Sequence, residues 1–150
     1  MLPVVPFVGL TGGMGAGKST ALRALEELGA QALSTDAVVH ELYTDERIRD
    51  AVVERWGSEV APGGVVDRAV VAAKAFAGGA EDRKWLESLL WPLVGVRIAA
   101  WLEHVRALRP APMAAVVEVP LLFEADMEAA FDATIAITAP EELRAARAGG

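Results

Sequence analysis

The chain has 150 residues, no cysteine and a formal net charge of −7 at pH 7. This length suits one domain with a substantial core, and the acidity excludes a general nucleic-acid binder, because polyanion binding depends on clustered Lys and Arg side chains. The lack of cysteine excludes disulfides and thiolate metal sites. We expect no signal peptide and no membrane partner, since the N-terminus is not basic and no apolar run approaches bilayer length. A cytoplasmic location is therefore expected.

The first expected elements are a strand, a glycine-rich loop and a helix. An apolar run over 7–10 predicts a short buried strand, and leucines along one side of 18–28 predict a helix that stops at Gly29. A second strand is expected over 30–33. Asp36 then lies just beyond the carboxyl end of a strand, where open α/β sheets bind their ligands.

The rest of the chain is expected to be a block of helices followed by two strands and a helix. The expected helices are at 37–43, 45–56, 67–77, 81–108 and 140–148, with a turn at 61–64, and the expected strands are at 113–119 and 133–138. Pro92 should end or kink the longest helix. This order predicts an α/β fold with a mostly parallel, doubly wound sheet. The block from about 37 to 110 would be an insertion over the ligand edge of a single domain, whose core is about 1–36 and 113–150.

The loop after the first strand carries the most informative spacing in the chain. From Gly12 it reads G-x-x-x-x-G-K-S, a phosphate-binding pattern placed between a strand and a helix. Glycine adopts positive φ easily, so successive backbone N–H groups can surround phosphate oxygens, and the helix adds the positive end of its dipole. The residues predicted to bind nucleotide are Gly12, Gly13, Met14, Gly15, Ala16, Gly17, Lys18, Ser19 and Thr20.

Three side chains of this loop have separate expected roles. Lys18 would reach the β- and γ-phosphates of a nucleoside triphosphate as a point charge, which makes it a candidate catalytic residue. Ser19 would offer its hydroxyl to Mg²⁺, and Thr20 would offer one to a phosphate oxygen. The structural alternative is a glycine-rich turn with an exposed lysine.

Several separate motifs resemble those of the dephospho-CoA kinase family. They are the loop at 9–20, Ser34-Thr35-Asp36 with the residues up to His40, Val66-Asp67-Arg68, the leucine-rich segment 86–94, and Glu118-Val119-Pro120-Leu121-Leu122-Phe123-Glu124. The family has a P-loop kinase fold and transfers the γ-phosphate of ATP to the 3′-hydroxyl of the dephospho-CoA ribose, the last step of coenzyme A biosynthesis. The resemblance therefore implies a kinase with ATP and Mg²⁺ as cofactors and dephospho-CoA as its small-molecule substrate.

The resemblance assigns a catalytic role to Asp36. This residue would orient the ribose hydroxyl and accept its proton, and positioning should matter more than proton abstraction because an aspartate is a weak base. The structural alternative is a helix N-cap, since Asp36 follows a strand and precedes a helical segment. Both roles can hold at once.

Glu118 lies inside an apolar strand, where a carboxylate is costly unless it is paired or near a cation. The resemblance implies that it contacts Mg²⁺ through water. The alternative is a strand-end residue that faces solvent.

Other residues are implied in acceptor or phosphate binding by the same resemblance. They are His40, Arg68, Leu121, Leu122, Phe123, Arg144 and Arg147, the last two at the start of the family's lid. Each has a structural alternative as a surface charge or an ordinary core residue.

The chain also departs from the family pattern. Trp91 stands where the family usually has a histidine before Pro92, and Ser34 and Thr35 stand where the first aspartate and its neighbour usually lie. The family normally continues for about another 50 residues, so we expect the last strand and helix to be missing, which would leave the strand at 133–138 with an unpaired edge. Two alternatives to the family's reaction stay open, a nucleotide-binding but inactive fragment and another small-molecule P-loop kinase.

Overall fold

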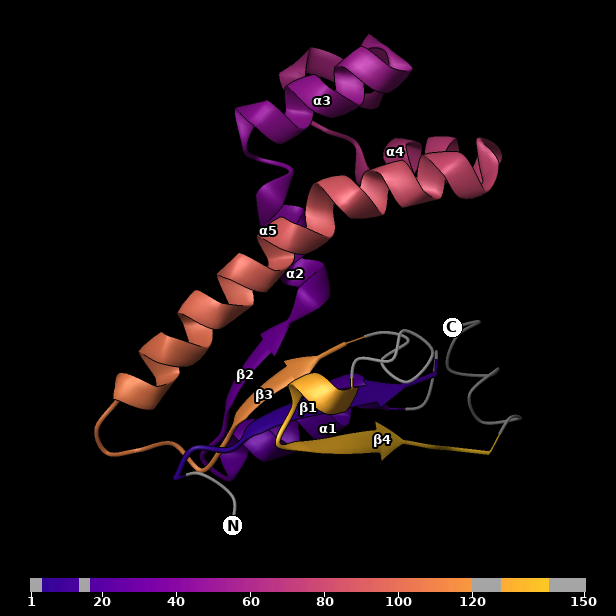
Figure 1. The fold of residues 1–150 in the computed structure, drawn as a ribbon. Coiled ribbons are helices and arrows are strands. Elements are labelled where there is room, and N and C mark those ends of the chain that lie inside the picture. Colours follow the sequence, from indigo (N-terminus) through magenta and orange to yellow (C-terminus); the bar gives the residue numbers. More distant parts are fainter. Residues whose placement is uncertain (1–3, 14–16, 120–127, 141–150) are drawn as a thin grey trace. The chain divides into compact units, whose positions relative to one another are not determined.

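The computed structural model describes residues 4–13, 17–119 and 128–140 (Figure 1). Four strands are present in this part of the chain: β1 (Phe7–Gly12), β2 (Gln31–Ser34), β3 (Ala115–Glu118) and β4 (Ala133–Ile137). The α-helices are α1 (Lys18–Glu27), α2 (Thr35–Leu42), α3 (Glu46–Trp56), α4 (Arg68–Ala77) and α5 (Gly79–Ala107). Short 3-10 turns lie at Ser58–Val60, Pro62–Gly64 and Glu128–Ala130.

The predicted elements between 7 and 138 are confirmed, with ends shifted by one or two residues. The predicted turn at 61–64 coincides with the second 3-10 turn. Pro92 lies inside α5, so the expected end of the helix there is wrong, whereas the expected kink stays a prediction. The predicted helix at 140–148 lies, beyond its first residue, outside the described part of the chain.

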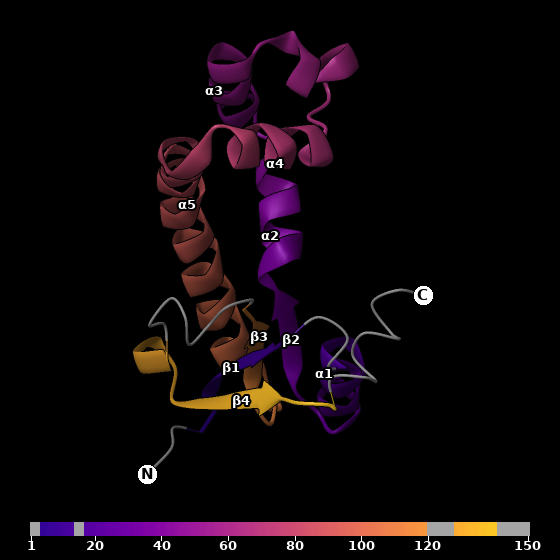
Figure 2. The same cartoon turned by 90° about the vertical axis from the view of Figure 1, so that its right-hand side faces the viewer.

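The four strands form one parallel sheet in the order β2-β3-β1-β4 (Figure 2). The parallel α/β fold predicted from the order of elements is therefore confirmed. Leu10 of β1 is level with Glu118 of β3, and Ser34 of β2 is level with the same glutamate. The carboxyl ends of these three strands consequently reach one edge of the sheet, the edge where ligands bind in open α/β folds. Among the described strands, β4 pairs only with β1.

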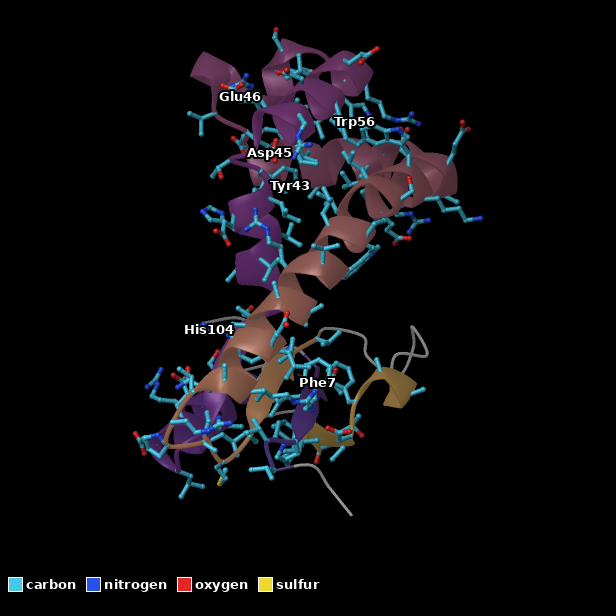
Figure 3. The ribbon with its side chains drawn as sticks, turned by 60° about the vertical axis from the view of Figure 1, so that its left-hand side comes forward. Phe7, Tyr43, Asp45, Glu46, Trp56 and His104 are labelled. Carbon is cyan, nitrogen blue, oxygen red and sulfur yellow. The ribbon has the colours of Figure 1, made fainter. Side chains whose placement is uncertain are left out.

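One face of the sheet is covered by the last turns of α5. Val5, Val105 and Ala115 form a buried cluster there, with Phe7, Trp101 and Leu102 packed against it. The ring of Phe7, labelled in Figure 3, also lies 4.6 Å from that of Phe131, measured between centroids.

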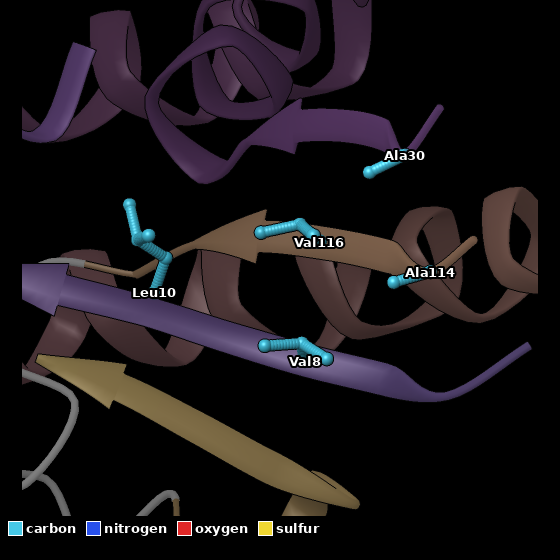
Figure 4. Packing of buried hydrophobic residues seen from close by; sticks show 5 residues of the cluster. All are labelled: Val8, Leu10, Ala30, Ala114 and Val116. Atoms are coloured by element: carbon cyan, nitrogen blue, oxygen red, sulfur yellow. The ribbon is translucent and has the colours of Figure 1, made fainter. Parts of the chain in front are cut away.

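The opposite face is covered by α1. Its buried cluster consists of Val8, Leu10, Ala30, Ala114 and Val116 (Figure 4). Ala21, Leu22 and Leu25 of α1 pack against this cluster, which explains why leucines recur along one side of that helix. Burying a side chain such as Leu10 contributes about 1.5–3 kcal/mol to the stability of the fold. The sheet is therefore doubly wound, and this packing fixes the start of α1 at the ligand edge.

The chain divides into two compact units. One comprises residues 1–35 and 100–150, and the other comprises residues 36–99. The second unit has its own core, in which Val52, Val60, Val71 and Val94 are almost completely buried. This unit begins one residue before the predicted insertion but ends at residue 99, inside α5, whereas the insertion was predicted to reach about residue 110. The assignment of one domain with an insertion over the ligand edge stays a prediction.

Helix α5 corrects one expectation from the sequence. By length and composition it is apolar enough to cross a membrane, whereas no segment was expected to reach that length. Glu87 and Arg97 are the only charged residues between positions 85 and 102. These two charges interrupt an otherwise mostly apolar stretch, which is why no long apolar segment was expected from the sequence. Length and composition are weak support for a membrane span, because core helices of soluble proteins pass the same test.

Candidate active site

The first backbone N–H groups of α1 have no partner within the helix, and the Gly17 N-cap offers them no side chain. Gly17 is the N-cap residue and has left-handed backbone angles, with φ 99°, which glycine adopts without strain. Its carbonyl accepts the N–H of Ala21 at 3.0 Å, so the N–H groups of residues 18–20 precede the first helical hydrogen bond. The first turn of α1, which is fully described, holds no acidic residue. This helix end can therefore attract an anion.

Gly12 brings the end of β1 into close contact with β4 and Lys18. A Cβ atom at this position would lie 2.7 Å from the carbonyl oxygen of Ile137 and 3.2 Å from Cγ of Lys18. The first distance is shorter than real Cβ contacts, and a backbone oxygen cannot move aside easily. A glycine is therefore required at the first position of the loop motif because of this close packing.

Lys18 and Glu118 form an ion pair at the carboxyl end of the sheet. Lys18 Nζ lies 3.4 Å from Glu118 Oε1, and both side chains are about one-fifth exposed. The pairing follows from the sheet order, because β3 lies beside β1 and its last residue is level with Leu10. Glu118 thus has a cation next to it, and it does not simply face solvent. Ser19 and Thr20, the next residues of α1, are exposed, so their hydroxyl groups are accessible.

Asp36 lies in the first turn of α2, which already begins at Thr35. Asp36 therefore does not occupy the N-cap position, which was the structural alternative considered for it. Its side chain is 77% exposed, and Arg68 Nη1 lies 3.6 Å from its Oδ1 and donates to its backbone carbonyl at 3.5 Å. The structure thus brings together the predicted catalytic aspartate and one predicted acceptor-binding arginine. Both belong to the unit of residues 36–99.

Arg68 also lines a hollow of about 260 Å³ in the same unit. It is lined by His40, Tyr43, Thr44, Arg49, Gly64, Val65, Val66 and Arg68. Burial raises the pKa of the Tyr43 phenol, although the nearby positive charge of Arg68 acts in the opposite direction. Arg49 was missed in the sequence, because its place on α3 gives no sign that it faces the same hollow as His40 and Arg68.

The other predicted site residues lie outside the described part of the chain. These are Met14, Gly15, Ala16, Leu121, Leu122, Phe123, Arg144 and Arg147. Their roles stay predictions.

The donor set near Lys18 fits a magnesium ion that is shared with a nucleotide. Mg²⁺ prefers hard oxygen ligands and usually takes one or two protein groups together with phosphates and water. The Ser19 hydroxyl and the Glu118 carboxylate are donors of this type. No group of three or more His, Cys, Asp or Glu side chains that could hold a metal occurs in the described residues.

Comparisons with known proteins agree with the motifs and with the fold. A sequence profile of dephospho-CoA kinase matches residues 6–149. Two curated relatives named dephospho-CoA kinase are 37% identical over 143 residues, from Moorella thermoacetica, and 39% identical over 141 residues, from Rhizobium meliloti. Both alignments cover 94% of this chain, but only 66% and 70% of the respective relatives. The chain thus spans about two thirds of the length of these proteins.

Two solved structures resemble the fold. The crystal structure of TT1252 from Thermus thermophilus has a TM-score of 0.74 at 30% identity, covering 97% of this chain and 71% of that one. The dephospho-CoA kinase from Campylobacter jejuni has a TM-score of 0.61 at 21% identity, covering 87% and 64%, and supports the fold alone. The profile match over almost all residues and the curated relatives show the family: this chain belongs to the dephospho-CoA kinases, with a P-loop kinase fold.

Proposed function

We propose that the chain catalyses the ATP-dependent phosphorylation of the 3′-hydroxyl of the dephospho-CoA ribose, in the cytoplasm, to give coenzyme A. The observation that carries the proposal is the match to the dephospho-CoA kinase family over residues 6–149. The start of α1 supports it independently, because its free N–H groups and Lys18 suit a triphosphate.

The nucleotide would bind where β1 meets α1. The free N–H groups at the start of the helix would donate to phosphate oxygens, and the ammonium of Lys18 would contact the β- and γ-phosphates. In the structure this ammonium contacts the Glu118 carboxylate at 3.4 Å. The pair keeps the lysine at the carboxyl edge of the sheet, so little side-chain entropy remains to be lost when a phosphate binds.

Ser19 directly, and Glu118 through water, would hold Mg²⁺. When bound, this ion neutralises charge on the phosphate oxygens.

The acceptor would be held by residues of the second unit. Asp36 would orient the 3′-hydroxyl, while His40 and Arg68 would contact the rest of dephospho-CoA. Arg68 already pairs with Asp36, so an acceptor phosphate would compete for the same guanidinium. This competition would free the Asp36 carboxylate for the hydroxyl when the acceptor is present.

The reaction is a single displacement at phosphorus. The 3′-oxygen forms a bond to the γ-phosphorus while the bond from that phosphorus to the β,γ-bridging oxygen breaks, and ADP leaves with the bond's electrons. The hydroxyl proton passes to the Asp36 carboxylate and from there to water. The positive charge of Lys18 stabilises the charge that develops on the transferred group and the leaving oxygen.

The proposal is tested by incubating the purified chain with ATP, Mg²⁺ and dephospho-CoA and identifying the products. We expect coenzyme A and ADP in equal amounts, with the new phosphate on the 3′-oxygen by ³¹P NMR. Nucleoside and sugar acceptors should react at least about 100-fold more slowly, because specificity follows contacts that only the correct acceptor makes. Nucleotide binding without any transfer would instead favour an inactive nucleotide-binding chain.

The variant Asp36→Asn tests most directly whether Asp36 acts on the acceptor hydroxyl. Turnover should fall about 100-fold or more while ATP binding is retained, because the neutral amide orients the acceptor hydroxyl less well than the charged carboxylate and cannot take its proton. Glu46→Gln is a matched control, since Glu46 is also an acidic residue in the first turn of a helix of the same unit. Equal losses of ATP affinity and turnover in Asp36→Asn would contradict the proposed role.

A further inference from the structure

Thr35 stands out because it is a buried polar residue. Of the residues that the structure describes, only Thr11 and Thr35 are polar and buried, and Thr35 is 2% exposed. A buried hydroxyl lowers stability unless it finds a hydrogen-bond partner. A side chain of the same shape without the hydroxyl, such as valine, would fill the same space. The presence of the hydroxyl therefore calls for an explanation in its contacts.

The hydroxyl of Thr35 binds a neighbouring strand. Its Oγ1 donates to the backbone carbonyl of Glu118 at 2.9 Å. Threonine at a helix start commonly accepts from an N–H of its own helix, whereas this hydroxyl donates across the sheet to the end of β3. The preceding residue, Ser34, is level with Glu118 in the register of β2 and β3. The bond thus fixes the first residue of α2 at the point where the strand pairing ends.

Glu118 is engaged at both its backbone and its side chain. The carbonyl accepts from Thr35, and the carboxylate pairs with Lys18 at 3.4 Å. The residue that contacts the phosphate-loop lysine therefore also anchors the start of α2. Asp36 is the next residue along that helix after Thr35.

We propose that Thr35 is a positioning residue, whose hydroxyl anchors the start of α2 to Glu118 and thereby sets the orientation of Asp36 toward the acceptor hydroxyl. The expected effect on catalysis depends on the proposed function. The anchoring itself rests only on the contact between Thr35 and Glu118. Misplacement of a reacting group by about 1 Å can cost a factor of about 100 in rate, so one hydrogen bond next to a catalytic residue can matter greatly.

The test compares Thr35→Val, which keeps the shape and removes the hydroxyl, with Thr35→Ser, which keeps the hydroxyl. We expect Thr35→Val to lower kcat about 10-fold or more and to change the KM for ATP by less than about twofold, because Lys18 is not displaced. Thr35→Ser should restore most of kcat. Thr134→Val, the same exchange on β4, is the matched control and should leave kcat unchanged. Equal kcat values in wild type and Thr35→Val would overturn the inference.

A double-mutant cycle separates positioning from a general loss of stability. If Thr35 acts through Asp36, then Thr35→Val should lower turnover little further in an Asp36→Asn background. A purely structural role would give the same factor in both backgrounds, after correction for the folded fraction. Such additive effects would refute the positioning role.

Hydrogen exchange of the amides of residues 37–40 tests the anchor without any reaction. Thr35→Val should speed exchange there about 10-fold relative to wild type, and Thr35→Ser should not. Unchanged protection in Thr35→Val would overturn the anchoring. If the wild-type chain does not phosphorylate dephospho-CoA, the proposed function fails, whereas the exchange measurement still decides whether Thr35 anchors α2.

Discussion

The N-terminus of α1 differs in chemistry from those of α3 and α4. The first N–H groups of α3 and α4 are satisfied by aspartate side chains: Asp45 accepts from the N–H of Arg47 at 2.8 Å, and Asp67 accepts from those of Ala69 and Val70 at 3.0 and 3.3 Å (Figure 3 labels Asp45). At α1 the corresponding position is Gly17, which has no side chain to offer.

The first N–H groups of α3 and α4 are therefore bound by side chains of the chain itself, whereas those of α1 can bind a ligand. Glycine at an N-cap forgoes only a few tenths of a kcal/mol relative to a side-chain cap, so α1 keeps its N–H groups free at little loss of stability. An aspartate there would satisfy the same groups and would repel phosphate. The capped starts of α3 and α4 therefore serve stability, whereas the uncapped start of α1 can bind an anion.

The largest expected effect comes from removing the cation at the open helix start. Lys18→Ala should lower phosphoryl transfer at least about 1,000-fold, because both ground-state phosphate binding and transition-state stabilisation are lost. Steady-state kinetics measures the loss, and thermal unfolding checks that the variant is folded. Lys74→Ala on α4 is the control and should leave turnover unchanged. A Lys18→Ala chain with normal turnover would show that this helix start does not bind the triphosphate.

The next test gives α1 the kind of cap that α3 and α4 have. Gly17→Asp and Gly17→Asn share the same left-handed backbone strain and similar hydrogen-bonding capacity, and they differ in one negative charge. We expect nucleotide affinity to fall about 10- to 100-fold more in the aspartate variant than in the asparagine variant, since a charge about 4 Å from phosphate costs a few kcal/mol. Calorimetric titration with an ATP analogue measures the ratio. Equal affinities would mean that no anion binds there.

Packing around the loop is tested at Gly12. The Cβ of Gly12→Ala would lie 2.7 Å from the Ile137 carbonyl oxygen, so we expect the free energy of unfolding to fall by about 1–3 kcal/mol. Gly95→Ala is the matched control, because no atom lies within 4 Å of its added Cβ and α5 is helical there. That variant should be stabilised by about 0.5–1 kcal/mol. Denaturant unfolding of both variants measures the contrast, and a neutral Gly12→Ala would contradict the close approach.

The sequence predicted those features that depend on local spacing. The phosphate loop follows from glycines at fixed intervals between an apolar run and an amphipathic segment, and both flanking elements are confirmed. The parallel sheet follows from the alternation of strands and helices. Family resemblance added membership of the dephospho-CoA kinase family, which the profile match and the curated relatives confirm.

Contacts between distant segments were not predictable in the same way. The pairing of Lys18 with Glu118 requires β3 to lie directly beside β1, although β2 comes between them in the chain. The contact of Arg68 with Asp36 joins residues that are 32 positions apart. Nothing in the segment Ser34-Thr35-Asp36 indicates that the threonine hydroxyl is bound to another strand, because local spacing does not determine which strands pair.

Of the two outcomes expected at Pro92, an end or a kink of the helix, only the end is wrong. Proline disfavours a helix interior, but α5 continues through it. Leu90 and Val94, on either side of the proline, are buried in the core. Packing of the helix can therefore outweigh a local preference, as is common for helices in folded proteins.

A smaller effect is expected from removing a capped helix start. Asp67→Ala should lower the free energy of unfolding by about 1 kcal/mol, because two N–H groups of α4 lose their acceptor. Asp67→Ser is the control, since its hydroxyl can accept the same bonds. Denaturant unfolding with an unchanged m-value gives the comparison. Similar midpoints for Asp67→Ala and wild type would show that α4 does not depend on its cap.

The smallest effect is the acid sensitivity of the cap on α3. Arg47 donates to Asp45 through its side chain and its backbone N–H, and it thereby holds the pKa of Asp45 below the ordinary value of 3.8. Because the folded-state pKa is the lower one, this stabilisation is present above about pH 4 and is lost as the pH falls through the folded-state pKa. Asp45→Asn keeps an oxygen to cap the helix but has no charge to lose. The difference in Tm between wild type and Asp45→Asn should therefore shrink as the pH falls from 6 toward 3, and a difference that stays constant over this range would show that the charge of Asp45 contributes nothing to the cap.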